Sequence, residues 1–150
     1  PGHTSSIRRI EAAMLSYHAD MTIKNNPFEL GMDRLVDLDM EVDFVSKAAL
    51  TRIRDEGVSQ LQVGLVFDGA PISGSNDEYW PVLVDGQKVG QVTSAVYSPR
   101  LEQNIALALV AVAHAGIGTK AMIDMSGEPR GCEIVQKPFF DPKKAIAAKG

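Results

Sequence analysis

The stretch from Asp85 to Pro99, DGQKVGQVTSAVYSP, constrains the fold of this 150-residue chain more than any other. Asp-Gly between two hydrophobic runs favours a two-residue hairpin turn, so Asp85-Gly86 predicts a β-hairpin whose second strand is Val89–Tyr97. Gly90 interrupts that strand, and an internal glycine marks a bend, a bulge or a close approach of another backbone. Closed and sandwiched sheets need such bends. We therefore expect the second half of the chain to wrap around this segment.

Apolar runs around the hairpin predict five further strands. The run at 104–113, NIALALVAVA, also suits a helix by propensity, and we assign it to a strand because hairpins lie on both sides. Ala70–Glu78 reads as a polar loop, Ser126–Pro129 as the last connection, and Pro138 as the end of the sheet. The five strands are Leu61–Phe67, Trp80–Val84, Asn104–Ala113, Thr119–Met125 and Gly131–Lys137.

Helical spacing of apolar residues predicts an amphipathic helix over residues 5–17, with N-cap candidates among Thr4, Ser5 and Ser6. Its apolar face would carry Ile7, Ile10, Met14 and Tyr17.

A second helix is expected over residues 44–56, from an Asp43 N-cap to a glycine at Gly57. Phe28–Asp39 stays open between a weak helix and a short strand, and 141–150 between a short helix and a frayed end. The second helix would bury Val45, Ala48, Ala49, Leu50 and Ile53.

Helices therefore precede strands, which indicates an α+β fold: an N-terminal helical segment followed by a small antiparallel β-barrel of about six strands in a Greek-key-like order. We expect three parts: a helical segment over 1–57, the barrel over 58–142 and a tail over 143–150. The chain opens on Pro1-Gly2-His3 without an initiator methionine, and we expect it to be a fragment of a longer protein.

Charge and composition exclude several classes of partner. The formal net charge is −4 with acids and bases interspersed, and the basic stripe of a nucleic-acid surface is missing. No apolar run approaches the roughly 20 residues that span a bilayer. Cys132 is the only cysteine, so an internal disulfide is impossible, which fits a cytoplasmic protein.

The sequence offers little chemistry of its own. It has no glycine-rich phosphate loop, no G-x-S-x-G elbow, and no metal-ligand spacing among His3, His18 and His114. We predict no catalytic side chain and no metal ligand. Asp37, Asp39, Glu41 and Asp43 form an acidic run that we interpret as a solvated edge rather than a cation site.

Arg9 and Tyr17, on the first predicted helix, are the candidate ligand-binding residues. A guanidinium can hold a carboxylate through two hydrogen bonds, and a tyrosine offers a ring for stacking and a hydroxyl. The alternative is an ion-paired arginine and a tyrosine that packs the helix.

Five ordered motifs resemble the C-terminal part of the aminomethyltransferase family, which includes the T-protein of the glycine cleavage system. Within it, the branch that demethylates dimethylsulfoniopropionate is the most similar, through Asn25-Asn26-Pro27, the QVTSAVYSPR run followed by Gln103-Asn104-Ile105, and the IRDEGV segment. The motifs are RIEAAMLSY (9–17), NNPFELGMDRLVDL (25–38), DFVSKAAL (43–50), VGQVTSAVYSPRLEQNIALA (89–108) and KPFFDP (137–142).

The resemblance implies three domains around a central hole that binds tetrahydrofolate, the last of them a small antiparallel barrel. It implies transfer of a methyl group from a sulfonium to N5 of the folate, a displacement that depends on positioning. Arg9 and Tyr17 would then lie near the folate tail as cofactor-binding residues. We expect the catalytic residues outside this chain and the fragment alone to be inactive. The expected partner is a small-molecule methyl donor, and a homodimer is left open.

Three alternatives stay in view. The parent could be the glycine-cleavage aminomethyltransferase itself, acting on an aminomethyl group carried by a lipoyl protein. It could be a non-catalytic folate-binding scaffold, although HADMTIKNNPFEL replaces the K-G-C-Y-x-G-Q signature of that branch. It could also be the folate domain of an amine oxidase fusion.

Overall fold

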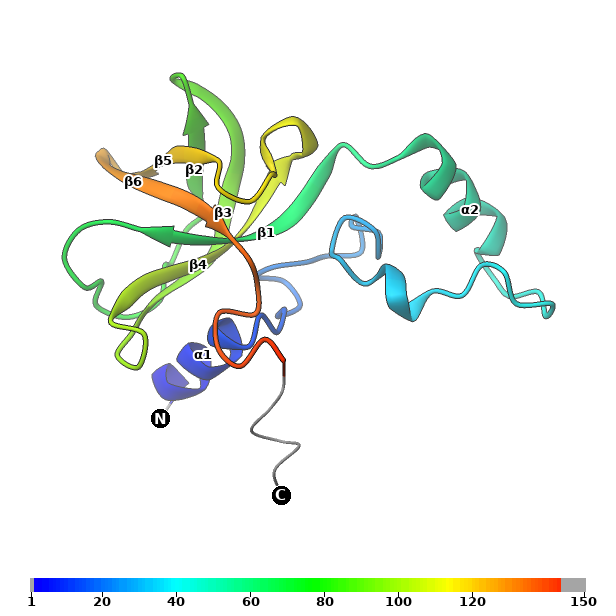
Figure 1. The fold of residues 1–150 in the computed structure, drawn as a ribbon, viewed down its shortest axis with the longest axis horizontal. Helices are drawn as coiled ribbons and strands as arrows, with labels where there is room; N and C mark the ends of the chain where they lie inside the picture. The colour runs from blue at the N-terminus through cyan, green and yellow to red at the C-terminus, as the bar shows by residue number, and fades with distance from the viewer. Residues whose placement is uncertain (1, 144–150) are drawn as a thin grey trace.

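A six-stranded antiparallel sheet forms most of the molecule, and it closes on itself as a barrel (Figure 1). The structure is a computed structural model that describes residues 2–143. Around the barrel the strands follow the order β1-β4-β3-β2-β5-β6. This order places β1 beside β4 after a long connection, as in a Greek key, and confirms the predicted α+β barrel. The strands are β1 (Gln60–Phe67), β2 (Trp80–Val84), β3 (Gln87–Ser98), β4 (Gln103–Ala111), β5 (Lys120–Met125) and β6 (Glu128–Val135).

Two-residue turns set the register of the β2–β3 and β5–β6 hairpins. Asp85 and Gly86 have φ of 50° and 76°, and Ser126 and Gly127 have φ of 55° and 96°. Positive φ at both central residues is the geometry of a type I′ turn, which matches the twist of the flanking strands. The second turn is shorter than predicted, because β6 begins at Glu128 and Pro129 pairs with Asp124. Pro129 is tolerated because β1 pairs with β6 only from Cys132 onward.

Gly90 marks both a β-bulge and a close approach of a neighbouring backbone. The β2–β3 register shifts beside it, between Val82 and Leu83. A Cβ on Gly90 would lie 2.3 Å from the Leu109 carbonyl oxygen, so β4 approaches β3 where a side chain cannot fit. The glycine thus permits the bend that the closed sheet requires.

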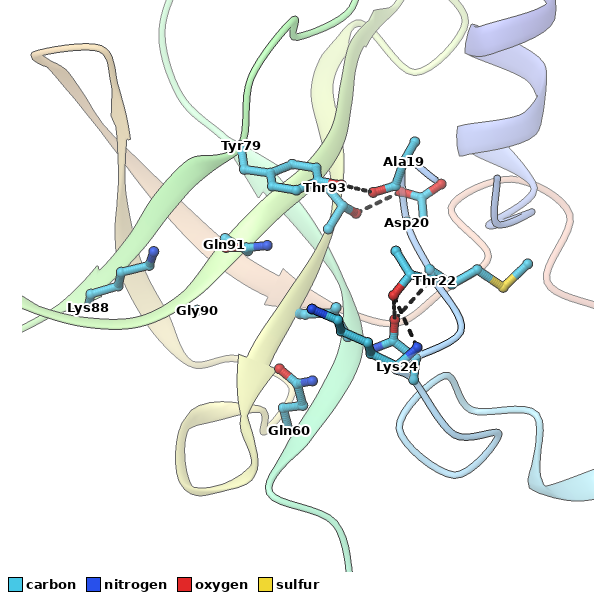
Figure 2. A pocket seen from close by; sticks show the side chains of 13 residues that line it. Ala19, Asp20, Thr22, Lys24, Gln60, Tyr79, Lys88, Gly90, Gln91 and Thr93 are labelled. Atoms are coloured by element: carbon cyan, nitrogen blue, oxygen red, sulfur yellow. Dashed lines mark hydrogen bonds between the residues drawn. The ribbon is translucent and has the colours of Figure 1, made fainter. Parts of the chain in front are cut away.

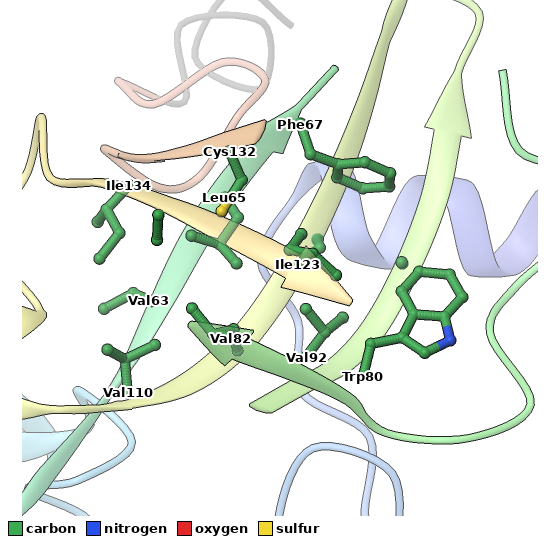
Figure 3. Packing of buried hydrophobic residues seen from close by; sticks show 14 residues of the cluster. Val63, Leu65, Phe67, Trp80, Val82, Val92, Val110, Ile123, Cys132 and Ile134 are labelled. Carbon is green, nitrogen blue, oxygen red and sulfur yellow. The ribbon is translucent and has the colours of Figure 1, made fainter. Parts of the chain in front are cut away.

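The barrel interior holds the main core, with alternate residues of each strand pointing inward (Figure 3). The phenyl ring of Phe67 meets the Trp80 indole edge-on at 6.4 Å between centroids, at one end of this core. The cluster is Val63, Leu65, Phe67, Trp80, Val82, Val92, Ala95, Ala106, Ala108, Val110, Ala121, Ile123, Cys132 and Ile134.

β4 is apolar on both faces because a second cluster covers its outer side. Ile105 and Leu107 point away from the barrel interior and pack with Ile10 of α1 (Gly2–Glu11), where all three are fully buried. Phe139 from the C-terminal segment packs on the same cluster. Burial on two faces explains the continuous run NIALALVAVA, for which strand was the correct choice.

The first helix is shorter than predicted, since α1 begins at Gly2 and ends at Glu11 rather than spanning 5–17. Ala13 adopts φ 53°, and the amides of Ala13 and Met14 donate to the carbonyls of Ile10 and Arg9. This is the Schellman arrangement, with alanine at the left-handed position that glycine usually fills. Tyr17 therefore lies beyond the helix, and Thr4, Ser5 and Ser6 lie within it rather than capping it.

The second helix, α2 (Lys47–Glu56), projects from the barrel (Figure 1). Its end was predicted correctly: Gly57, with φ 80°, donates its amide to the Ile53 carbonyl. Its start and its burial were predicted wrongly. The N-cap is Ser46 rather than Asp43, no residue of α2 is buried, and Val45 is 94% exposed. An amphipathic pattern gives the face of a helix but not the surface that covers it.

The segment between the helices is largely irregular. Residues 33–35, within the stretch left open between helix and strand, form a short 3₁₀ helix, η1 (Asp33–Leu35); a second, η2 (Val112–His114), follows β4. Among the helices of residues 2–143, none combines the length and the apolar character that a membrane-spanning helix requires. The predicted tail lies mostly outside the described residues.

Candidate functional site

A buried ion pair joins the end of α1 to the loop that follows it. Arg9 Nη1 donates to Asp20 Oδ2 at 2.7 Å, and the Asp20 side chain is fully buried while that of Arg9 is 23% exposed. The same carboxylate oxygen accepts the Ser16 amide at 2.9 Å, which closes the turn 16–20. Asp20 therefore fixes the path of the chain past Tyr17.

A β-bulge in β3 supplies the other partners of this pair. The β3–β4 register shifts between Val92 and Ser94, leaving Thr93 as the extra residue. Arg9 Nη2 donates to Ser94 Oγ at 2.8 Å, and the Thr93 hydroxyl lies 2.6 Å from Asp20 Oδ1. Adjacent strand residues normally point to opposite faces, so the bulge is what directs both hydroxyls toward Arg9 and Asp20.

A groove of about 460 Å³ opens beside this network, between the 19–25 segment and the outer face of β3 (Figure 2). Tyr79 closes one end: its hydroxyl lies 2.9 Å from the carbonyl oxygens of His18 and Ala19. Lys24 lies on the wall formed by the loop and Lys88 on the wall formed by β3. The groove therefore combines amide and hydroxyl groups with two cations, which suits a polar ligand that carries carboxylates.

Tyr17 borders an adjoining pocket of about 540 Å³ that Tyr79 also lines. Its ring is half exposed and contacts the His18 ring edge-on, with centroids 4.4 Å apart. His18 has φ 72° and donates its amide to the Met21 carbonyl, so this turn presents the Tyr17 ring to solvent. An exposed aromatic ring at the rim of a pocket can stack on a flat ligand.

The structure places the two predicted residues in different surroundings. Arg9 is engaged with Asp20 and Ser94, as the ion-paired alternative expected, whereas Tyr17 does not pack a helix. Asp20, Thr93 and Tyr79 were not predicted from the sequence. Nothing local marks these residues, because the bond from Thr93 to Asp20 joins positions 73 residues apart.

A metal has no evident place here. Within the described part of the chain, no three or more His, Cys, Asp or Glu side chains gather in a way that could hold an ion. Burial in the barrel raises the pKa of the Cys132 thiol to about 11, which keeps it protonated and unreactive.

Comparison with known proteins gives a consistent relationship. The family of the glycine cleavage T-protein C-terminal barrel domain matches residues 61–141. The aminomethyltransferase of Synechococcus sp. (strain CC9902) is 40% identical over 132 residues, which cover 88% of this chain and 35% of that protein. This chain belongs to the aminomethyltransferase family. The aminomethyltransferase of Symbiobacterium thermophilum is 37% identical over 134 residues, covering 88% of this chain and 34% of that protein.

A solved aminomethyltransferase supports the same architecture. The crystal structure of the glycine cleavage system aminomethyltransferase T from Bartonella henselae aligns with a TM-score of 0.81 at 21% identity, over 91% of this chain and 38% of that one. At that identity the likeness establishes the fold. The chain spans about a third of the length of the aminomethyltransferases it matches, and its barrel is the family's C-terminal domain.

Proposed function

We propose that this chain is the C-terminal barrel of a tetrahydrofolate-dependent aminomethyltransferase, within a whole protein that transfers a one-carbon unit from a lipoyl carrier protein to tetrahydrofolate. The observation that carries the proposal is 40% identity, over 88% of the chain, to a protein named aminomethyltransferase. Demethylation of dimethylsulfoniopropionate, the first expectation from sequence, is the second candidate. The QVTSAVYSPR run and Asn25-Asn26-Pro27 favour it.

The chemical groups of this site match those of a folate. Folate joins a flat aromatic ring system to a glutamate that carries carboxylates. The exposed Tyr17 ring suits the first part, and Lys24 and Lys88 in the adjoining groove suit the second. We assign Tyr17 a direct contact with the cofactor. Arg9 holds the turn that carries Tyr17 through Asp20, and in this proposal its guanidinium, which is partly exposed, lies near the folate tail.

The oxidation level of the transferred carbon separates the two candidate reactions. A carbon bonded to both sulfur and nitrogen is at the level of formaldehyde, so an aminomethyl donor yields a methylene-level folate. A sulfonium methyl is at the level of methanol, so its transfer yields 5-methyltetrahydrofolate. The whole protein should be assayed with tetrahydrofolate and each donor in turn, and the folate product identified by mass spectrometry. Formation of 5-methyltetrahydrofolate alone would replace the first candidate with the second.

The role of Tyr17 is tested in the same assay. Tyr17→Ala should raise the KM for tetrahydrofolate about tenfold, since base–aromatic stacking contributes about 1–3 kcal/mol. Met14→Ala is the matched control, because Met14 lies on the same segment and is 57% exposed. Equal KM values for the two variants would remove Tyr17 from the folate site. The 150-residue chain alone should show no turnover. The identity of the donor, a cytoplasmic location and the exclusion of nucleic acid and membranes stay predictions, and the homodimer stays open.

A further inference from the structure

A third cavity, of about 250 Å³, lies where β6 separates from β1. β6 pairs with β1 only over Gly64–Phe67. At Gln62 the backbone amide donates instead to the Glu29 carbonyl at 2.7 Å, so the 27–31 segment lies along this part of β1. The cavity opens between these three pieces of chain and the loop that contains Ile117.

Gln62 carries an unsatisfied donor at this cavity. Gln62 is one of the residues that line the space and is 4% exposed, and its Nε2 is the one buried side-chain nitrogen or oxygen without a hydrogen-bond partner among the side chains described. Its Oε1 accepts from Lys137 Nζ. A flipped amide would place an NH₂ group against the ammonium, so the orientation is fixed by Lys137. An orphaned buried amide costs stability unless something else accepts its hydrogens.

Lys137 adds a cation beside the orphaned donor. Its Nζ lies 3.9 Å from where a Cβ on Gly31 would be, which places the ammonium at the end of the cavity that the 27–31 segment closes. Burial lowers the pKa of Lys137 to about 8, against an opposing attraction from the Asp20 carboxylate. The ammonium is therefore poorly solvated, and a second anion would stabilise it.

The rest of the lining is aliphatic, with Leu61, Val63 and Ile134 among its members. A water molecule occupies about 30 Å³ of liquid, so the cavity holds about eight heavy atoms. The complementary ligand has one negatively charged acceptor group and a short apolar body. Sulfate or phosphate would satisfy the donors but leave the aliphatic walls unfilled.

We propose that this cavity binds a small aliphatic carboxylate, whose oxygens accept hydrogen bonds from Gln62 Nε2 and Lys137 Nζ. The site is separate from the folate groove and does not depend on the function proposed above. It would allow a short-chain acid to bind the barrel without occupying the groove beside Asp20.

The test uses isovalerate as the probe, with isovaleramide and sulfate as comparisons, added to the ¹⁵N-labelled 150-residue chain. We expect saturable binding of isovalerate with a Kd at or below about 1 mM. The shifts should concentrate on the Gln62 side-chain amide and on the backbone amides of Gly31 and Ile117. Isovaleramide and sulfate should each bind about tenfold more weakly, because one lacks the charge and the other the apolar body.

Variants then locate the site. Lys137→Met and Gln62→Leu should each weaken isovalerate at least about tenfold, whereas Lys120→Met on the exposed end of β5 should stay within about twofold. Far-UV circular dichroism checks that each variant is folded. Shifts spread over the surface of the wild-type chain, no saturation at about 20 mM, or equal binding by sulfate would each overturn the proposal. The binding of isovalerate to the wild-type chain tests the proposal even if a variant fails to fold.

Discussion

Replacing Gly90 with alanine tests the closest backbone approach in the barrel. The added Cβ would lie 2.3 Å from the Leu109 carbonyl oxygen and 2.8 Å from Val110 Cα. A carbon and a carbonyl oxygen in neighbouring strands normally stay about 3.3–3.6 Å apart. β3 and β4 would have to separate by roughly 1 Å next to Val92, Ala108 and Val110, which pack inside the barrel.

The expected cost follows from that displacement. Overpacking a well-filled core costs about 1–3 kcal/mol and sometimes more, and here the obstacle is backbone that cannot rotate away. The alanine recovers about 0.4–1 kcal/mol by restricting the unfolded chain. We expect Gly90→Ala to lower the free energy of unfolding by about 3 kcal/mol, or the Tm by about 10 °C.

Urea unfolding followed by fluorescence measures this directly, because Trp80 is the only tryptophan and is buried in the core. The midpoint should fall at an unchanged slope. Gly116→Ala is the matched control: its Cβ would meet Thr119 Oγ1 at 3.5 Å, an ordinary contact, and its stability should change by less than about 1 kcal/mol. Equal stability of the two variants would refute the close approach of β4 to Gly90.

Three further predictions concern the end of α1, the buried Asp20 carboxylate and the largely buried Lys137 ammonium. Ala13→Gly should stabilise the fold by about 1 kcal/mol in the same assay, because Ala13 has φ 53° and glycine adopts that conformation without strain. Asp20→Ala should cost about 2–4 kcal/mol, since Arg9 loses a buried partner while keeping some contact with water, and Asp20→Asn should cost less; equal losses would show that the charge is irrelevant. Between pH 8 and 10.5 the unfolded chain keeps the Lys137 proton that the folded chain, with a pKa of about 8, has lost, so this contribution to stability rises with pH. Partial exposure of Lys137 reduces this gain in the free energy of unfolding to about 1–2 kcal/mol. The gain should be absent in Lys137→Met when urea midpoints at pH 7.5 and 10 are compared. The Cys132→Ala background removes an opposing effect, because the Cys132 thiol has a folded pKa of about 11 and disfavours folding as pH rises above 9.0.

Much of the candidate site depended on contacts that no local pattern encodes. Arg9 was recognisable as a candidate, yet its partner Asp20 lies in an unremarkable loop and its other partner, Ser94, follows a bulge in β3. A bulge changes which face a side chain occupies, so strand alternation alone misplaces Thr93 or Ser94. Tyr17 was placed on a helix because its spacing fits, and the left-handed Ala13 ended the helix first.

The sequence by itself determined the elements whose cause is local. Asp85-Gly86 and Gly57 act through their own φ angles, and alternating apolar residues within β1 or β6 give each strand its inner face. Tertiary structure decided what lies against those elements. The pairing of β1 with β6 closes the barrel, α1 covers the outer face of β4, and α2 remains exposed despite its apolar residues. The physical reason is that backbone conformation depends on neighbouring residues, whereas burial and ion pairing depend on groups that only the folded chain brings together.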